Sequence, residues 1–165
     1  MAGVIVADAS PLIVLGRIGR LELLVQTCGQ VIVPDAVRSE CMADMSKAGA
    51  RAIGQAFEAG WLSEQPAHLL FQAASAPGLD AGEAAAIGLA YALHCPILID
   101  ERLGRAVALQ RGVVVMGTLG VFLRAKLQGL TPAVGPLLQA LKEQGYFLST
   151  AVEQEVLRRA GELPG

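Results

Sequence analysis

The run Val4-Ile5-Val6-Ala7-Asp8, followed closely by Ser10 and Pro11, sets the expected fold of this chain. Four apolar residues without polar alternation are typical of a parallel strand that is buried on both faces. Ser10 is a good helix N-cap and Pro11 suits the first helical position. The stretch therefore predicts a strand that leads into a helix. Asp8 would lie at the carboxyl end of that strand, where open α/β sheets place their ligand sites.

Further short strands are expected along the chain. Val31–Val33, Ile97–Ile99 and Val113–Val115 are also apolar and β-branched, and residues 61–64 predict a short edge strand. Helical stretches separate these runs, which predicts an α/β fold with a parallel sheet and right-handed crossovers. Residues 66–78 are ambiguous, although Pro77-Gly78 indicates a turn. Helices are expected at residues 10–16, 21–25, 34 onward, 48–59, 80–93, 102–110, 118–128, 132–143 and 150–160.

Composition indicates one globular domain over residues 1–165. Apolar residues make up 53% of the chain and charged residues 17%, which excludes disorder. No apolar stretch approaches the roughly 20 residues that a membrane span needs. The apolar N-terminal run has no basic flank, so we expect no signal peptide and a cytoplasmic location.

Cysteines and net charge narrow the function classes. Cys28, Cys41 and Cys95 are widely spaced, and the chain has only two histidines, so we expect buried thiols rather than a zinc site. The net charge of −2 excludes a global basic surface for nucleic acid. Any nucleic-acid role would need local basic clusters, metal ions or a partner. An aromatic content of 4% also disfavours a base-stacking platform.

Carboxylates follow two of the apolar runs, at Asp8 and at Asp100-Glu101. The carboxyl ends of parallel strands meet at one edge of the sheet, so these acids would crowd together there. Crowded carboxylates are costly unless a cation lies among them. One of Asp100 and Glu101 would face the site, and the other would favour the N-terminus of the next helix.

Two helices carry further candidate acids. Glu40 lies at the border of the apolar stripe of the helix after the second strand, and Asp44 is a substitute one turn later. A salt bridge to an arginine is the alternative for Glu40. Asp80 and Glu83 fit a capping box, in which Asp80 caps the helix and Glu83 reaches back. Spacing alone does not separate that interpretation from a metal site, and Glu83 can serve the site while Asp80 caps.

Other catalytic signatures are missing from the sequence. There is no GxGxxG, GxxxxGK[ST], GxSxG or HExxH motif. His68 and His94 are isolated and lack an obvious serine or cysteine partner. The candidate ligands are therefore oxygens, which suit Mg²⁺ or Mn²⁺ rather than zinc.

The acidic residues lie in stretches that resemble, in order, the motifs of PIN-domain nucleases. The stretches are Asp8-Ala9-Ser10-Pro11-Leu12-Ile13, Val33-Pro34-Asp35-Ala36-Val37-Arg38-Ser39-Glu40, Leu79-Asp80-Ala81-Gly82-Glu83-Ala84-Ala85-Ala86-Ile87 and Leu98-Ile99-Asp100-Glu101-Arg102-Leu103-Gly104-Arg105. The continuation at residues 117–126 is similar to a prokaryotic branch of this superfamily that is related to VapC toxins. The resemblance covers residues 4 to 130. It implies a three-layer α/β/α sandwich, Mg²⁺- or Mn²⁺-dependent RNA cleavage, homodimers and an antitoxin partner.

The resemblance also implies which residues form the site. Asp8, Glu40 and Glu83 match metal-site acids. For the fourth acid, VapC-type proteins often show Thr-x-Asp after the strand, a register that selects Glu101, whereas closeness to the strand end favours Asp100. Both are candidates, and Asp100 is preferred. Residues 130–165 match none of the motifs and would cover an edge of the fold or form a dimer or partner surface.

The preferred hypothesis is a metal-dependent single-strand endoribonuclease that acts as the toxin of a toxin–antitoxin pair. Ser10 and Thr118 would hold ligands or a phosphate, and Arg102, Arg105 or Lys126 would contact the RNA backbone. The alternative is a catalytically inactive interaction module with the same fold. A phosphotransfer or phosphatase domain is disfavoured because Asp8-Ala9-Ser10 contains no second aspartate.

Overall fold

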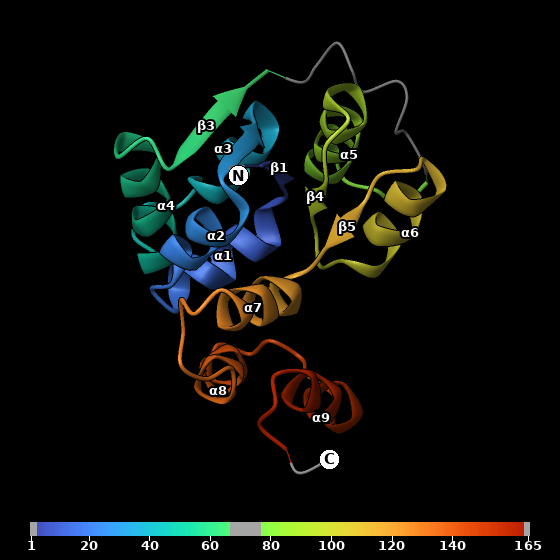
Figure 1. The fold of residues 1–165 in the computed structure, drawn as a ribbon. Helices are drawn as coiled ribbons and strands as arrows, with labels where there is room; N and C mark the ends of the chain where they lie inside the picture. The colour runs from blue at the N-terminus through green and yellow to red at the C-terminus, as the bar shows by residue number, and fades with distance from the viewer. Residues whose placement is uncertain (1–2, 67–76, 164–165) are drawn as a thin grey trace.

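A parallel sheet of five strands forms the centre of the molecule (Figure 1). The computed structural model describes residues 3–66 and 77–163. The strands lie in the order β3-β2-β1-β4-β5, with helices packed around them to give a three-layer α/β/α arrangement. The strands are β1 (Val4–Ala7), β2 (Gln30–Pro34), β3 (Leu62–Gln65), β4 (Ile97–Leu98) and β5 (Val115–Met116).

The apolar runs form the buried strands, as the sequence predicts. Val6 in the central strand β1 pairs with Ile32 of β2 on one side and with Ile97 of β4 on the other, and all three side chains are buried. β3 lies at one edge of the sheet, which confirms the expected edge strand. β5, at the other edge, begins two residues later than expected. The reason is that the Val113 N–H donates to Ala108 O (2.9 Å), which closes the turn after α6 (Arg102–Gln110).

Nine helices are assigned in the described part of the chain. They are α1 (Ala9–Arg17), α2 (Leu21–Cys28), α3 (Asp35–Cys41), α4 (Ala48–Glu58), α5 (Ala81–Leu93), α6 (Arg102–Gln110), α7 (Thr118–Leu127), α8 (Gly135–Glu143) and α9 (Thr150–Arg159). None of these described helices has both the length and the apolar content that crossing a bilayer requires. Pro77-Gly78 forms the expected turn, whereas His68 and most of the ambiguous segment lie outside the described residues.

Two sets of close contacts connect helices that are far apart in sequence. α1 packs on α4 through Gly16 and Gly49, and a Cβ on Gly16 would lie 3.0 Å from Gly49 O. At the end of the chain, the Glu162 carboxylate accepts hydrogen bonds from Val134 N (2.7 Å) and Gly135 N (2.9 Å) and pairs with Lys126 (2.9 Å). This carboxylate satisfies backbone donors at the start of α8, which begins at Gly135 rather than at the expected Pro132.

The strand order reverses between β1 and β4. The chain steps outward from β1 to β2 and β3, and then returns to the other side of β1 for β4 and β5. In open α/β sheets, ligands bind outside the carboxyl ends of the strands at such a switch point. Asp8 directly follows β1 and its N–H donates to Leu98 O (2.9 Å), two residues before Asp100. The fold therefore places two of the candidate acids at the switch point.

Candidate active site

Asp8 is the buried centre of a group of carboxylates. Asp8 is 3% exposed and occupies the N-cap position of α1, but its side chain makes no capping hydrogen bond. The expectation that Ser10 caps this helix is wrong, because α1 already begins at Ala9 and Ser10 is exposed within it. Burial, and then the charges of Asp80, Glu40 and Asp100, raise the pKa of Asp8 to about 7, although a hydrogen bond from the Ala9 N–H lowers it in part.

Glu40 reaches this group from α3, next to Asp80. A Cβ on Gly82 would lie 3.5 Å from both Glu40 Oε2 and Asp80 Oδ1, so the two acids meet over a residue without a side chain. Burial, and then the charge of Asp80, raises the pKa of Glu40. Glu40 forms no ion pair within the described residues, which excludes the salt-bridge alternative there. Asp44 instead accepts hydrogen bonds from the N–H (3.0 Å) and O–H (2.6 Å) of Ser46.

Glu83 brings an unsatisfied oxygen to the group. Asp80 Oδ1 accepts the Glu83 N–H (2.7 Å), which confirms the Asp80 half of the capping box. The Glu83 carboxylate does not return the bond. Its Oε2 is buried without any hydrogen-bond partner, and a Cβ on Gly104 would lie 3.3 Å from it. Burial, and then the neighbouring Asp80, Asp8 and Glu101, together raise the pKa of Glu83 to about 8. A buried, unpaired carboxylate oxygen is costly unless a cation or a proton satisfies it.

Asp100 is held from the side of α7. Its Oδ1 accepts the Thr118 N–H (2.8 Å) and its Oδ2 accepts the Thr118 hydroxyl (2.6 Å). The Tyr146 side chain lines the same cleft as Asp100. Burial, and then the charge of this carboxylate, raise the pKa of the tyrosine hydroxyl. Arg105 donates to Ile99 O (2.9 Å) on the same side. These contacts fix the Asp100 carboxylate at the sheet edge.

Glu101 has a different environment from Asp100. Its carboxylate caps α6 by accepting the Gly104 N–H (2.7 Å), and this bond lowers its pKa. Glu101 also lies close enough to Glu83 and Asp80 for their charges to interact. Both acids therefore border the group, and the metal-ligand assignment stays a prediction. Ser10 and Arg102 are exposed at the starts of their helices, and Lys126 is engaged by Glu162.

The structure thus brings together four predicted acids that are far apart in sequence, namely Asp8, Glu40, Glu83 and Asp100. A family model described as a PIN domain matches residues 4–162. The chain belongs to the PIN-domain family. PIN domains are in general nucleases that use divalent metal ions. The match extends over α8 and α9, beyond the limit at residue 130 that the sequence motifs suggested. No curated protein matches the chain significantly.

Sequence reasoning missed two members of this PIN-domain site. Asp80 was left out of the predicted site because a capping role explained it equally well, yet its carboxylate acts on Asp8, Glu40 and Glu83. The signal was available, since Asp80 lies one turn from Glu83 in the same motif. Tyr146 carried no local signal, because only the packing of the last helices brings it to Asp100.

The donor set of this PIN domain fits a hard divalent cation. Every candidate ligand is a carboxylate, and Glu83 Oε2 is an orphaned buried acceptor. Within the described ranges, no three Asp, Glu, His or Cys side chains lie close enough to hold one metal ion together. Mg²⁺ commonly uses one or two protein carboxylates and keeps several waters, so a direct triad is not required. Burial, and then the charges of Glu40 and Asp8, raise the pKa of the Cys41 thiol to about 12, so this thiol stays protonated in the metal-free protein.

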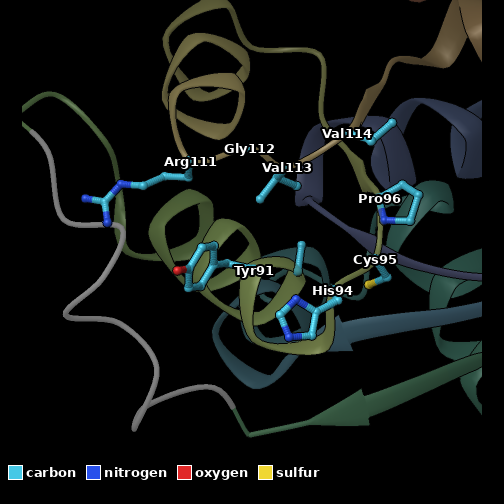
Figure 2. Close-up of a pocket in the computed structure, with 9 residues that line it drawn as sticks. Tyr91, His94, Cys95, Pro96, Arg111, Gly112, Val113 and Val114 are labelled. Carbon is cyan, nitrogen blue, oxygen red and sulfur yellow. The ribbon is translucent and has the colours of Figure 1, made fainter.

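A pocket near the amino ends of β4 and β5 lacks the carboxylates of the candidate active site. It has a volume of about 230 Å³ and is lined by Tyr91, His94, Arg111 and their neighbours, without any Asp or Glu (Figure 2). His94 and Pro96 precede β4, which places the pocket near the amino end of that strand, whereas Asp100 lies past the carboxyl end. His94 is therefore separated from the carboxylates of the PIN-domain site.

Proposed function

We propose that this PIN domain is a metal-dependent endoribonuclease that cuts single-stranded RNA. The observation that supports this best is the group of carboxylates around Asp8 at the switch point of the sheet. Without a cation, burial and mutual repulsion raise the pKa of Asp8 to about 7 and that of Glu83 to about 8. Such an arrangement destabilises the charged acids in the free protein and favours a bound cation.

In this proposal, Asp8, Glu40, Glu83 and Asp100 hold one or two Mg²⁺ or Mn²⁺ ions, directly or through water, with Asp80 and Glu101 beside them. A bound ion of this kind lowers the pKa of its water and stabilises negative charge on a phosphate. Thr118 fixes the Asp100 carboxylate through two hydrogen bonds, so Asp100 meets the ion in one orientation. Glu83 Oε2 supplies an acceptor that no protein donor competes for within the described residues.

The biological role that we propose is the toxin of a toxin–antitoxin pair, with an antitoxin protein as partner and a homodimer as the assembled form. The similarity of residues 117–126 to VapC-related proteins supports this role. Its test is co-purification of the chain with the product of the neighbouring gene, combined with light scattering of the chain alone. A monomeric protein without a neighbouring antitoxin-like gene would contradict it.

Cleavage of a labelled single-stranded RNA tests the proposed activity. The purified protein should cut it with Mg²⁺ or Mn²⁺, stop in EDTA, and lose activity in Asp8→Ala and Asp100→Ala. Asp44→Ala is the matched control, because Asp44 lies four residues after Glu40, beyond the end of α3 at Cys41, and its carboxylate is engaged by Ser46. Asp44→Ala should keep near-native activity. Cleavage that persists in EDTA or in Asp8→Ala would overturn the proposal.

A second candidate is a PIN-like interaction module without catalysis. The observation that favours it is the engagement of Asp100 by Thr118 and of Glu101 by Gly104, which leaves fewer free carboxylate oxygens for a metal. Titration with Mn²⁺ distinguishes the two functions. An enzyme should bind Mn²⁺ and lose that binding in Asp8→Asn, whereas a module should show little affinity in either protein.

A further inference from the structure

A cleft of about 920 Å³ opens beside the acidic site. Asp100 and Tyr146 line it together with residues of β5, α7 and α9, and the two helices pack against each other. β5 is the last strand on this side of the sheet within residues 3–66 and 77–163, so no described strand fills the space. A ligand that lies in this cleft therefore reaches the Asp100 side of the site.

Arginines from three different elements line the cleft. They are Arg105 of α6, Arg124 of α7 and Arg159 of α9. Arg124 is exposed and takes part in no ion pair among the described residues. The lining also holds two acids, Asp100 and Glu155, and Glu155 pairs with Arg159 (2.9 Å) and with Arg158. The cleft lining thus carries three arginines against two acids in a protein whose net charge is −2, and among the described residues only Arg159 of the three pairs with an acid.

Between the arginines the surface of the cleft is small and apolar. Gly117, Gly120 and Leu123 contribute from α7 and its N-cap, and Val152, which is 44% exposed, contributes from α9. Arginine guanidinium groups bind phosphates well. The apolar walls make van der Waals contact with a base, and Tyr146 gives the cleft one aromatic side chain on which a base can stack. This combination matches a flexible single strand whose phosphates and bases can turn to opposite walls.

We propose that the cleft between α7 and α9 binds the single-stranded RNA on its way to the acidic site, with Arg124 and Arg159 as phosphate contacts. This inference rests on the proposed ribonuclease function. It assigns part of substrate binding to α9, a helix outside the four acidic motifs. Lys126, which the sequence suggested as a phosphate contact, does not line the cleft, and it pairs with Glu162.

The test measures binding of a short fluorescein-labelled single-stranded RNA in EDTA by fluorescence anisotropy at several salt concentrations. Each phosphate contact to a single strand contributes about 0.7 to the slope of log K against log salt. Arg124→Gln and Arg159→Gln should therefore each lower the slope by about 0.7, and the double variant by about 1.4. Arg158→Gln is the matched control, since Arg158 is the neighbour of Arg159, also pairs with Glu155, and does not line the cleft.

A steric variant makes the same test independent of charge. Val152→Trp would fill the cleft from an exposed position, so it should weaken RNA binding while leaving Mn²⁺ affinity and the unfolding midpoint near those of the unmodified protein. Suppose that the unmodified protein cuts RNA, but that the arginine variants and Val152→Trp bind RNA as tightly as the unmodified protein. The cleft is then not the RNA path, and the ribonuclease function stands. An equal loss in Arg158→Gln and Arg159→Gln would also overturn the inference. If the unmodified protein neither binds nor cuts RNA, both proposals fail.

Discussion

At the scale of single residues, the site consists of acids whose charged forms are destabilised when no cation is bound. Asp8 is almost fully buried among three other carboxylates, and Glu83 keeps one oxygen unpaired. Hydrogen bonds from the protein satisfy Asp100 and Glu101 instead. The free energy that a cation can recover is therefore concentrated on Asp8 and Glu83.

The stability of the metal-free protein should fall as the pH rises. Because burial raises the pKa of Asp8 from 3.8 to about 7, the folded protein keeps a proton that the unfolded chain releases between these values. The folded state should thus lose about 4 kcal/mol from this residue across that window. Thermal unfolding in EDTA measures the effect. Asp8→Asn should flatten the profile and raise the midpoint at pH 8, together with loss of Mn²⁺ binding.

Asp44→Asn provides the control for this profile. Its carboxylate is exposed and its pKa is lowered by Ser46, so Asp44→Asn should not flatten the fall in stability above neutral pH. A metal-free protein that is more stable at pH 8 than at pH 5 would show that Asp8 is already neutralised by some other group.

Gly117 should tolerate no side chain without damage to the site. A Cβ there would lie 2.9 Å from Asp100 Oδ1 and 2.8 Å from Arg105 Nη1. Gly117→Ala should therefore displace Asp100 and lower the affinity for Mn²⁺, which calorimetry measures. In the control Gly120→Ala, the Cβ meets only the side chain of Met116 at 3.1 Å. An unchanged Mn²⁺ affinity in Gly117→Ala would mean that Asp100 is not a ligand.

At the scale of the elements, glycines set how closely two helices approach. Gly16→Ala should destabilise the fold by roughly 1–3 kcal/mol, because the new Cβ meets the backbone carbonyl of Gly49, which cannot swing away. Urea unfolding measures this loss. The control is Gly54→Ala in α4, the helix that contains Gly49. The Cβ of this variant would meet only the flexible ends of Met42 and Met45. Equal stabilities of the two variants would show that α1 and α4 can separate at little cost.

Local sequence patterns predicted the elements well where one signal dominates. The apolar runs of β1, β2 and β4 are buried in parallel register, as expected. Errors arose where two residues competed for one role. Ser10 has the better capping chemistry, yet the helix already begins at Ala9, and Val113 is strand-like but closes a turn. These choices depend on backbone hydrogen bonds that composition and periodicity do not encode.

At the scale of the whole molecule, the meeting of four acids was predictable, because parallel strands and their following helices share one sheet edge. The participation of Tyr146 was not predictable. It depends on how the segment after α8 folds back toward Asp100, which is a matter of tertiary packing. The same holds for the cleft beside β5, which forms only once α9 packs against α7.

Glu162 should stabilise the whole C-terminal part of the fold. Glu162→Ala would remove the acceptor for two backbone N–H groups, one of them on the buried Val134, and the partner of Lys126. We expect a loss of about 1–3 kcal/mol and faster hydrogen exchange in α8. Glu153→Ala should cost less than about 1 kcal/mol, since Glu153 only forms an exposed pair with Lys142. Similar losses in the two variants would show that Glu162 is one more surface ion pair.

The position of β1 in the sheet has a consequence for synthesis of the protein on the ribosome. β1 is made first, but its neighbour β4 and the helix start that holds Asp100 are made much later. A growing chain that carries Asp8 and Glu40 therefore lacks the other half of its acidic site until residues 80–118 have also left the exit tunnel. The acids of the proposed site can thus meet only after the segment from Asp80 to Thr118 has emerged and folded beside β1.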